Sequence, residues 1–368
     1  MKTILHIIDT TGPGGAETVF IDLATRLPKN KFKAVIVIRG KGWVYDELVR
    51  RGVKPIILDA KGSFNWRYLL SLRAIIKRES VDLIQSHLLG SNVYSGLVGL
   101  LTGIPVVATF HGAVDIGDKE RFKKLKFAAI NYGAKRIIAV SKNLSLDIIA
   151  RTPVNRRKLR IIYNGIDINE FNLAHSDNLR DKFSWSKDTI IIGSLGNIRT
   201  AKSYDILLQA AALLRNKNDK LKFVIAGQGH STLLDKLLKL RTELKLENDV
   251  QFLGFTDEPA EFLSNLDIFL LSSTSEGFSI ATVQAMASGI PVLATKSGGP
   301  EEIITHGEDG WLVDVGKANA IADGLEQILS EPELLEKMTT NGKETLRLKF
   351  NMEINLSAYG DIYKELIG

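Results

Sequence analysis

An acidic turn between a strand and a helix is the stretch of this sequence best suited to chemistry. Residues 275–289 read SEGFSIATVQAMASG and follow the apolar run LDIFLL at 266–271. This pattern places Glu276 in a turn at the carboxyl end of a predicted strand, beside the free N–H groups of a helix start. Open α/β sheets bind ligands at such ends, and a helix amino terminus favours an anion. The stretch therefore predicts a binding site for an anionic ligand.

Two cations and two histidines follow other predicted strands in the same way. Arg199 and Lys202 lie near the start of the helix after the first strand of the second half, where they could clamp a diphosphate. His111 directly follows the strand 106–110, and His87 ends the strand before it. We expect His111 to contact the ligand, with His87 as the second candidate. Solvated loop cations and purely structural histidines are the alternatives.

A glycine-rich loop follows the first predicted strand. Gly12, Gly14 and Gly15 precede a helix that begins near Ala16. Such a loop lets the backbone approach a ligand closely and directs helix N–H groups towards it. The spacing matches neither the GxGxxG fingerprint in its frame nor a P-loop, which needs Gly-Lys-Ser/Thr. The loop is a candidate ligand contact, and a plain sharp turn is the alternative.

Short apolar runs alternate with helical stretches along the chain, which predicts α/β structure with parallel sheets covered on both faces. The 368 residues suffice for two domains. Residues 166–187 are polar and weakly patterned, so we place the linker there, and residues 330–368 are predicted to be helical, with a last helix over 355–366. The predicted strands are 4–8, 34–38, 55–58, 83–85, 106–110, 136–140 and 160–163, then 190–194, 222–226, 250–253, 267–271, 292–295 and 311–313.

The charge of the chain is unevenly distributed. Residues 1–170 carry 28 Lys and Arg against 14 Asp and Glu, whereas residues 171–368 carry 20 against 28. The basic half suggests an anionic partner, with a merely solvated surface as the alternative, and no nucleic-acid-binding signature is present. There are no cysteines, which excludes thiolate chemistry and disulfides. Because no apolar run reaches the roughly 18 residues of a membrane span and no signal-peptide pattern is present, we expect a cytoplasmic protein.

The predicted helix 118–132 concentrates positive charge in the basic half. Phe122, Leu125, Ala129 and Tyr132 recur in it at helical spacing. We expect these side chains to cover the sheet while the basic face is solvated. The alternative is an interfacial helix whose cations contact anionic lipid headgroups. The cations are Lys119, Arg121, Lys123, Lys124 and Lys126.

Motifs spread over nearly the whole chain are GGAE at 14–17, DLIQSH at 82–87, TFHG at 109–112, AVSKN at 139–143, IIYNGID at 161–167, NIRTAK at 197–202, FVIAGQG at 223–229, the acidic turn, and GGPEEII at 298–304. Together they resemble the motifs of retaining glycosyltransferases of family 4. The resemblance implies the GT-B architecture, two Rossmann-like domains with the donor in the cleft between them. It predicts an acceptor-binding domain over 1–168, a nucleotide-sugar-binding domain over 169–350, and a helix over 351–368 that returns to the first domain.

The resemblance also implies roles for individual residues. Gly14 and Gly15 match the loop that approaches the donor phosphate and the acceptor. His111 matches the histidine that contacts the transferred sugar, and Arg199 and Lys202 match the basic pair on the diphosphate. Together with Glu276, the last three residues are the predicted catalytic group. The predicted donor-binding residues are Gly14, Gly15, Asn197, Gly277, Phe278, Ser279 and Gln284.

The acidic turn departs from the family pattern at one position. Glu276 matches the first acid of the signature, which holds sugar hydroxyls, and the backbone at Gly277, Phe278 and Ser279 would bind sugar and phosphate. Gln284 stands where the family usually has a second glutamate, which holds the ribose hydroxyls. A carboxylate accepts from both hydroxyls, whereas an amide has one acceptor and one donor group. We expect altered or weaker nucleotide recognition.

The implied reaction is transfer of a sugar, with retention, from a nucleotide-sugar to a glycan or lipid-linked acceptor of the cell surface. A UDP-sugar is the expected donor. The leaving phosphate would take the acceptor proton, with Asp115 as an outside candidate for a base. No Asp-x-Asp triplet occurs, so we expect no metal and no other cofactor. A nucleotide-sugar 2-epimerase and a non-catalytic partner subunit are the alternatives. Peripheral contact with the inner face of the membrane is a further expectation.

Overall fold

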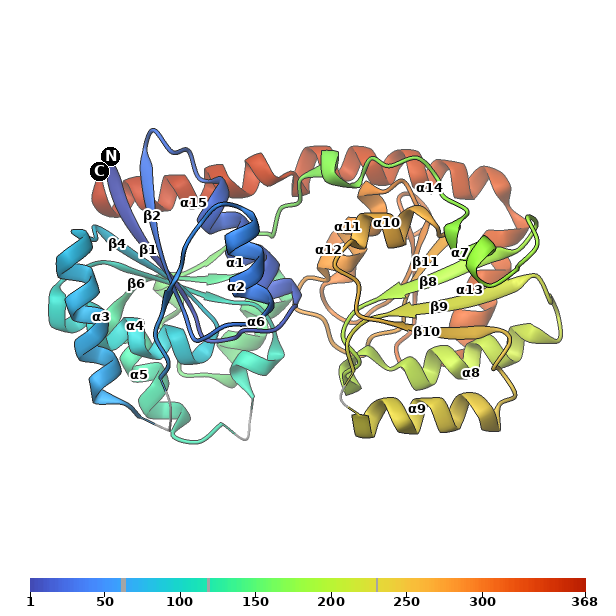
Figure 1. Ribbon diagram of the computed structural model, residues 1–368, viewed down its shortest axis with the longest axis horizontal. Helices are drawn as coiled ribbons and strands as arrows, with labels where there is room; N and C mark the ends of the chain where they lie inside the picture. Colours follow the sequence, from blue (N-terminus) through green and yellow to red (C-terminus); the bar gives the residue numbers. More distant parts are fainter. Residues whose placement is uncertain (61–63, 118–119, 230) are drawn as a thin grey trace. The chain divides into compact units, whose positions relative to one another are not determined.

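Two compact units make up the computed structural model, which describes residues 1–60, 64–117, 120–229 and 231–368. Unit 1 comprises Met1–Gly165 and Glu353–Gly368, and unit 2 comprises Ile166–Met352. Each unit holds one parallel sheet with helices packed on it (Figure 1). The predicted α/β class with two Rossmann-like sheets is confirmed. The sequence placed the unit boundaries at 169 and 351 instead of 166 and 353.

Seven parallel strands form the sheet of unit 1. They are β1 (Lys2–Ile8), β2 (Phe32–Ile38), β3 (Ile56–Ile57), β4 (Leu83–His87), β5 (Val106–Phe110), β6 (Ala134–Ala139) and β7 (Leu159–Ile161). Their order is β3-β2-β1-β4-β5-β6-β7, so the order reverses between β1 and β4. All residues of β4 and β5 are buried, as expected for central strands covered on both faces. Ligands of such sheets bind at the carboxyl ends of the strands near the reversal.

The C-terminal helix belongs to unit 1 and completes its core. In Figure 1 it is the red helix α15, alongside the strands of this unit. Tyr359 and Tyr363 of α15 are fully buried in one cluster with Leu23 and Leu83. Each such aromatic side chain contributes on the order of 2 kcal/mol through burial. The unit's helices are α1 (Gly15–Arg26), α2 (Trp43–Arg50), α3 (Trp66–Glu79), α4 (Leu89–Thr102), α5 (Lys123–Gly133), α6 (Lys142–Arg151) and α15 (Met352–Ile367), with turns η1 (Ala113–Ile116) and η2 (Arg156–Lys158).

Helix α5 starts later than the sequence predicted. Its first residue is Lys123, and Phe122 before it is in the left-handed region with φ of 56°. Arg121 therefore precedes the helix, and Lys119 lies outside the described residues. Lys123, Lys124 and Lys126 are on the first turn, where Lys123 donates to the Ile116 carbonyl at 3.0 Å.

The face of α5 that packs on the unit is also different from the predicted one. Phe127 and Ile130 are buried, whereas Phe122, Leu125 and Tyr132 are 66%, 71% and 77% exposed. The prediction that these three residues cover the sheet was wrong. Helices α4 and α5 approach closely through glycine, since a Cβ on Gly133 would lie 2.0 Å from a backbone oxygen of α4. The small face containing Gly133 is thus the one that packs.

Six parallel strands in the order β10-β9-β8-β11-β12-β13 form the sheet of unit 2. The strands are β8 (Ile190–Leu195), β9 (Leu221–Ala226), β10 (Val250–Gly254), β11 (Ile268–Leu271), β12 (Val292–Thr295) and β13 (Trp311–Val313). The order reverses between β8 and β11, which places a second ligand-binding edge there. The helices are α7 (Asn178–Lys182), α8 (Tyr204–Arg215), α9 (Ser231–Glu243), α10 (Pro259–Ser264), α11 (Ile280–Ala287), α12 (Pro300–Ile303), α13 (Ala318–Ser330) and α14 (Pro332–Thr345), with turns η3 (Ile168–Phe171), η4 (Thr200–Lys202) and the π-helix η5 (Leu346–Phe350).

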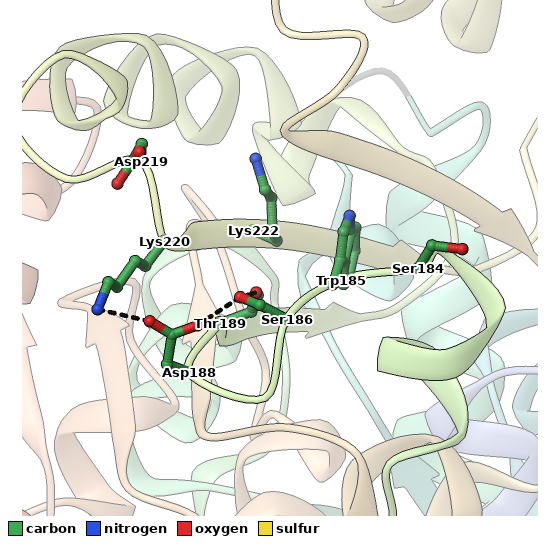
Figure 2. A pocket seen from close by; sticks show the side chains of 8 residues that line it. All are labelled: Ser184, Trp185, Ser186, Asp188, Thr189, Asp219, Lys220 and Lys222. Carbon is green, nitrogen blue, oxygen red and sulfur yellow. Dashed lines mark hydrogen bonds and ion pairs between the residues drawn. The ribbon is translucent and has the colours of Figure 1, made fainter.

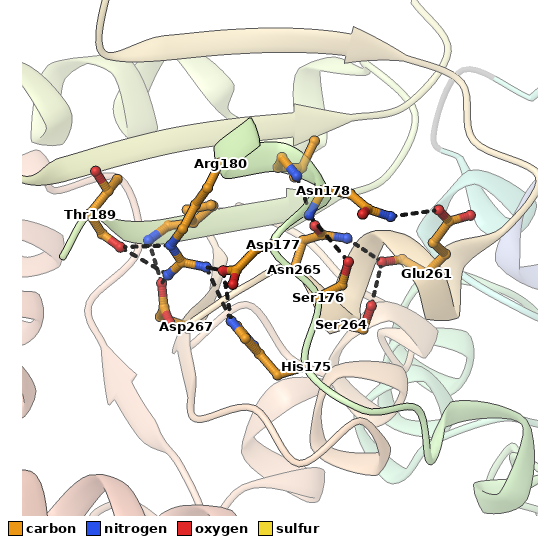
Figure 3. A network of polar contacts seen from close by, with 12 residues as sticks. His175, Ser176, Asp177, Asn178, Arg180, Thr189, Glu261, Ser264, Asn265 and Asp267 are labelled. Carbon is orange, nitrogen blue, oxygen red and sulfur yellow. Dashed lines mark hydrogen bonds and ion pairs between the residues drawn. The ribbon is translucent and has the colours of Figure 1, made fainter. Parts of the chain in front are cut away.

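The segment predicted as a linker, 166–187, is instead structured by a buried arginine. It contains η3 and α7, and the Arg180 side chain of α7 is only 7% exposed. Figure 3 shows its guanidinium bonded to the Asp267 carboxylate at 2.6 Å and to the Thr189 carbonyl at 2.9 Å. Asp177 forms a further, more exposed ion pair with Arg180 at 3.1 Å. These bonds attach α7 to the beginnings of β8 and β11.

Asp267→Ala should destabilise unit 2 by about 3 kcal/mol. The substitution leaves a buried guanidinium without its main counter-charge and removes the acceptor for the Ile191 N–H, which lies 2.7 Å from Oδ2. Denaturant unfolding followed by far-UV circular dichroism measures the change. Glu243→Gln, at an exposed helix pair with Lys239, is the matched control and should change stability by less than about 0.5 kcal/mol. Equal effects for both variants would contradict this role of Arg180.

Candidate active site

The acidic turn of unit 2 carries a largely buried ion pair. Nζ of Lys202 donates to Oε1 of Glu276 at 2.8 Å, and Oγ of Ser273 donates to the same oxygen at 2.6 Å. The side chains of Lys202 and Glu276 are 18% and 13% exposed. Charges this far from water interact strongly, and each depends on the other for compensation. The pair joins residues 74 positions apart at the carboxyl edge of the sheet.

Backbone hydrogen bonds hold the turn that carries Glu276. Its N–H donates to the Ser297 carbonyl at 2.9 Å, and its carbonyl accepts from the Gly299 N–H at 3.1 Å. The N–H of Thr274 donates to the Ala201 carbonyl at 2.7 Å, which ties the turn to η4. Since Lys202 ends η4, the same bonds that shape the turn also fix the base of the ion pair.

Helix α11 begins directly after this turn. Gly277 is partly exposed, whereas Phe278 and Ser279 are buried, and Ser279 is in the left-handed region with φ of 60°. The Ser279 hydroxyl bonds the Thr282 hydroxyl at 2.8 Å and does not cap the helix. The Thr282 N–H donates to the Ser279 carbonyl at 3.1 Å, so the N–H groups of Ile280 and Ala281, the first two residues of α11, are the ones left for an anion. Gln284 lies in the second turn of α11 and is partly exposed.

Asn197, predicted to bind the donor, and Arg199, predicted to be catalytic, lie on the loop after β8. Arg199 is exposed, and its guanidinium has no ion-pair partner among the described residues. Of the predicted basic pair, only Lys202 is therefore held by an acidic side chain. Oδ1 of Asn197 accepts from the Gln228 N–H at 3.2 Å. This loop approaches the loop after β9 so closely that a Cβ on Gly227 would lie 2.0 Å from the Gly196 oxygen. Glycine at 227 thus permits the geometry.

The two histidines of unit 1 form a hydrogen-bonded pair at the carboxyl edge of its sheet. Nδ1 of His87 lies 2.8 Å from Nε2 of His111, and the rings are stacked with centroids 5.1 Å apart. His87 is fully buried, whereas His111 is partly exposed. Burial lowers the pKa of His111 to about 3 and that of His87 well below its usual value of 6.5. Both rings are therefore neutral at pH 7.

Asp115 fixes the backbone around this pair. Its Oδ2 accepts from the His111 N–H at 2.8 Å, and its Oδ1 accepts from the Leu89 N–H at 3.2 Å. The carboxylate thus ties the loop after β5 to the start of α4. Burial raises the pKa of Asp115 to about 6, against the lowering effect of these hydrogen bonds. Its oxygens are occupied by backbone groups, which indicates a positioning role.

Two further carboxylates of this edge have no predicted role from the sequence. Glu17 of α1 is buried and folds back over the glycine loop, since a Cβ on Gly14 would lie 2.4 Å from its Oε2. Asp9 directly follows β1, and burial raises its pKa to about 6. A Cβ on Gly90 would lie 2.0 Å from Oδ2 of Asp9. Asp9 could have been predicted as a site residue from the sequence, because it directly follows the first predicted strand. Gly15 is exposed as the first residue of α1.

A pocket of about 320 Å³ in unit 2 lies away from Lys202 and Glu276 (Figure 2). It is found where β8 and β9 begin, at the opposite end of the strands from Lys202 and Glu276. Its charges are largely paired at the surface, as in the 2.6 Å contact between Lys220 and Asp188. No predicted site residue lines it. Across the described part of the chain, no cluster of three or more His, Asp or Glu could hold a metal ion.

Comparison with known proteins identifies the class and then the family. Two parallel-sheet units with ligand-binding edges define the GT-B fold class, and a solved Anabaena protein, Alr3699/HepE in complex with UDP and glucose, shares this fold at a TM-score of 0.89, covering 100% of both chains at 22% identity. The family model described as Glycosyltransferase Family 4 matches residues 13–170, and that described as Glycosyl transferases group 1 matches residues 175–345. The chain belongs to the family 4 glycosyltransferases.

Curated relatives agree with this assignment. The N-acetyl-alpha-D-glucosaminyl L-malate synthase of Bacillus anthracis is 28% identical over 301 residues, which cover 80% of this chain and 77% of the relative. The UDP-Gal:alpha-D-GlcNAc-diphosphoundecaprenol alpha-1,3-galactosyltransferase of Escherichia coli is 23% identical and covers 96% of this chain and 94% of its own. The resemblance read from the motifs is thereby confirmed.

Asp115→Asn should become more stable relative to the wild type as pH rises. The folded protein keeps a proton on Asp115 up to about pH 6, whereas the unfolded chain loses it near 3.8. Rising pH through this window therefore lowers wild-type stability by about 3 kcal/mol, and the variant lacks this titration. Urea unfolding of both proteins between about pH 4 and pH 7 measures the difference.

The exposed acid Asp361 of α15 offers a control for this titration. The stability difference between Asp361→Asn and the wild type should vary far less across the same pH range. A difference that is equally flat for Asp115→Asn would show that Asp115 is not held in the protonation state described here.

Proposed function

We propose that this protein is a retaining, metal-independent glycosyltransferase that moves a hexose from a UDP-sugar to a glycan or lipid-linked acceptor in cell-surface polysaccharide biosynthesis. The observation that carries the proposal is the buried Lys202–Glu276 pair beside the free N–H groups of α11. In the donor complex the ammonium binds the diphosphate and the carboxylate, held by Ser273, accepts hydrogen bonds from sugar hydroxyls. The positive ammonium of Lys202 then faces the negative diphosphate, and the negative carboxylate of Glu276 faces the hydroxyl donors of the sugar.

Stabilisation of the leaving diphosphate is the main chemical task. The bond from the sugar to the phosphate oxygen breaks as an oxocarbenium-like sugar forms, so negative charge grows on the diphosphate. Lys202 and the α11 N–H groups lie in fixed positions where they can stabilise that charge. The absence of an Asp-x-Asp triplet from the sequence is the basis for proposing that no metal shares this work.

Retention of configuration follows from same-face attack by the acceptor. The departing phosphate oxygen takes the acceptor proton, so the reaction needs no carboxylate base. The structure of unit 1 supports this part of the proposal, because the oxygens of Asp115, the outside candidate, accept backbone N–H groups. His111 is neutral at pH 7 and contributes a hydrogen bond to the transferred sugar rather than a charge.

The choice of donor and acceptor is supported by the relatives. The solved Anabaena protein contains UDP and glucose, and the Escherichia coli relative is named for a UDP-Gal donor and a diphosphoundecaprenol acceptor. A lipid-linked acceptor would require the protein to reach a membrane surface. No helix of the described chain is long and apolar enough to cross a membrane.

Unit 1 has a surface suited to such contact, formed by Arg121, Phe122, Lys124, Leu125 and Tyr132. The three apolar side chains and both cations are exposed on α5 and the two residues before it. Apolar groups that enter the interface next to cations that attract anionic headgroups are typical of peripheral membrane contacts. We propose that this basic apolar surface docks on the inner face of the cell membrane.

The test of the proposal is incubation with radiolabelled UDP-glucose, UDP-galactose or UDP-N-acetylglucosamine and membrane-extracted lipid-linked glycans. Label in the lipid fraction with an α-linkage supports the proposal. A free epimerised sugar without acceptor would instead indicate the 2-epimerase alternative. Donor binding without any turnover, in the presence of the full acceptor pool, would indicate a non-catalytic partner subunit.

Lys202→Ala should lower the rate of transfer on the order of 10²- to 10³-fold, because it removes the cation that stabilises the leaving diphosphate. Glu276 remains bonded to Ser273, so the far-UV spectrum should stay that of a folded protein. Initial rates with radiolabelled donor measure the effect. Lys239→Ala on the exposed side of α9 is the control, and turnover of Lys202→Ala close to the control's would refute the phosphate role.

Gln284→Glu should bind UDP about fivefold more tightly. A carboxylate accepts from both ribose hydroxyls, and a hydrogen bond to a charged group is worth about 1 kcal/mol more than a neutral one. Isothermal titration calorimetry with UDP and with 2′-deoxy-UDP measures the gain and whether it depends on the ribose. An unchanged UDP affinity would mean that Gln284 has another role.

Lys124→Glu should weaken binding to phosphatidylglycerol vesicles about 30-fold. The change removes one cation and adds one anion at the basic apolar surface, and each such charge near a membrane is worth about 1 kcal/mol. Vesicle co-sedimentation measures it, with neutral phosphatidylcholine vesicles as a lipid control and Lys239→Glu as a protein control. If both variants bind equally well, the surface is not the docking site.

A further inference from the structure

A continuous chain of buried polar side chains leads from the C-terminal helix to His111. The Tyr363 hydroxyl of α15 lies 3.0 Å from Oε1 of Gln85 in β4. Nε2 of Gln85 lies 3.2 Å from Nε2 of His87, whose Nδ1 lies 2.8 Å from Nε2 of His111. Tyr363, Gln85 and His87 are completely shielded from solvent, and His111 alone reaches the surface. This row of hydrogen-bonded side chains therefore begins in the core at Tyr363 and ends at the site with His111.

The acceptors around Gln85 determine the direction of its hydrogen bonds. Nε2 of Gln85 lies 2.9 Å from the Thr109 hydroxyl and 3.2 Å from Nε2 of His87, which take its two N–H groups, and the Ser86 carbonyl oxygen lies 3.4 Å from the same nitrogen. Reversal of the amide would place its oxygen against the carbonyl oxygen of Ser86. The amide nitrogen thus donates, and its oxygen accepts from the Tyr363 hydroxyl.

This direction passes through both imidazole rings. A neutral imidazole has one N–H and one bare nitrogen. Because Nε2 of His87 accepts from Gln85, Nδ1 of His87 carries the proton and donates to Nε2 of His111. Nε2 of His111 is then bare, and Nδ1 of His111 carries the proton. In the described part of the chain this Nδ1 has no partner.

Packing and hydrogen bonds around His87 and His111 hold the two imidazole rings in place. Phe20 packs edge-on against His87, with centroids 5.4 Å apart, and the rings of His87 and His111 are stacked. Asp115 holds the backbone N–H of His111. A second hydroxyl of α15, that of Tyr359, lies 3.3 Å from Thr109, the other partner of the Gln85 amide. The helix thus supports the amide at two points.

We infer that Gln85 and Tyr363 are positioning residues that hold His111 as an Nδ1–H hydrogen-bond donor towards an oxygen of the bound sugar. The inference rests on the proposed function, in which His111 contacts the transferred sugar. It assigns the C-terminal helix a part in the site, since α15 supplies the first hydroxyl of the chain. A sugar that lacks the oxygen facing His111 would leave this N–H unpaired in a partly buried place. The hydrogen-bonded side chains therefore favour binding of sugars that have that oxygen.

Histidine-selective ¹⁵N labelling tests the inference directly. Long-range ¹H–¹⁵N correlation spectra distinguish protonated from bare ring nitrogens, and the six histidines can be assigned by single His→Gln replacements. The wild type without ligand should show protonated Nδ1 and bare Nε2 on both His87 and His111. A bare Nδ1 on His111 would overturn the inference.

Two variants separate positioning from simple structural support. Gln85→Leu should leave His111 as a mixture of both tautomers, and Tyr363→Phe, which keeps the amide, should cause a smaller shift in the same direction. The KM for UDP-sugar should rise about tenfold in Gln85→Leu, with a smaller change in kcat. Unchanged tautomers in both variants would overturn the role of the chain. If Gln85→Leu does not fold, Tyr363→Phe alone decides.

Titration with UDP-glucose and with UDP distinguishes this inference from the proposed function. The Nδ1–H signal of His111 should move with UDP-glucose and not with UDP. If it moves but no transfer is found with any acceptor, the proposed function fails while the inference stands. If transfer occurs and the signal is insensitive to UDP-glucose, the inference fails while the proposed function stands.

Discussion

The ion pair between Lys202 and Glu276 is the interaction on which the proposed donor site of unit 2 depends. Both charges are more than four-fifths shielded, so each is destabilising without the other or a ligand that replaces it. Two strand-to-helix connections, after β8 and after β11, must meet for the pair to form, and the bond from Thr274 to Ala201 brings them together. The sheet, the turn and η4 thereby place a cation and an anion at one edge before any donor arrives, which is the preorganisation that charge stabilisation requires.

Unit 1 differs in that its histidine pair carries no charge. Burial leaves His87 and His111 neutral at pH 7, so the histidine pair offers an oriented hydrogen-bond donor rather than a cation, while Asp115, whose pKa is raised to about 6, accepts backbone N–H groups. The orientation comes from deep inside the unit, because Gln85 and the C-terminal helix fix the rings. Desolvation, which costs stability at Asp115, is also what makes the ring tautomers definite.

Local patterns were sufficient to predict most strands, and β5, β12 and β13 match the predicted ranges. Lys202, Glu276 and His111 were found because each follows a strand. The contacts between them and their partners were not predictable, since Lys202 and Glu276 are 74 residues apart and Tyr363 lies 278 residues from Gln85. The error at α5 has a similar cause. Phe122 and Phe127 both fit helical periodicity, and only the close glycine contact with α4 decides which is buried.

Binding of the donor's diphosphate by Lys202 can be tested by comparing UDP with uridine. Calorimetric affinities of both ligands for the wild type and for Lys202→Met isolate the contribution of the phosphates, because the base and ribose are common to the two ligands. We expect UDP to bind the wild type on the order of 100-fold more tightly than uridine, and most of this advantage to disappear in Lys202→Met. An unchanged ratio of the two affinities in Lys202→Met would show that Lys202 does not bind the diphosphate.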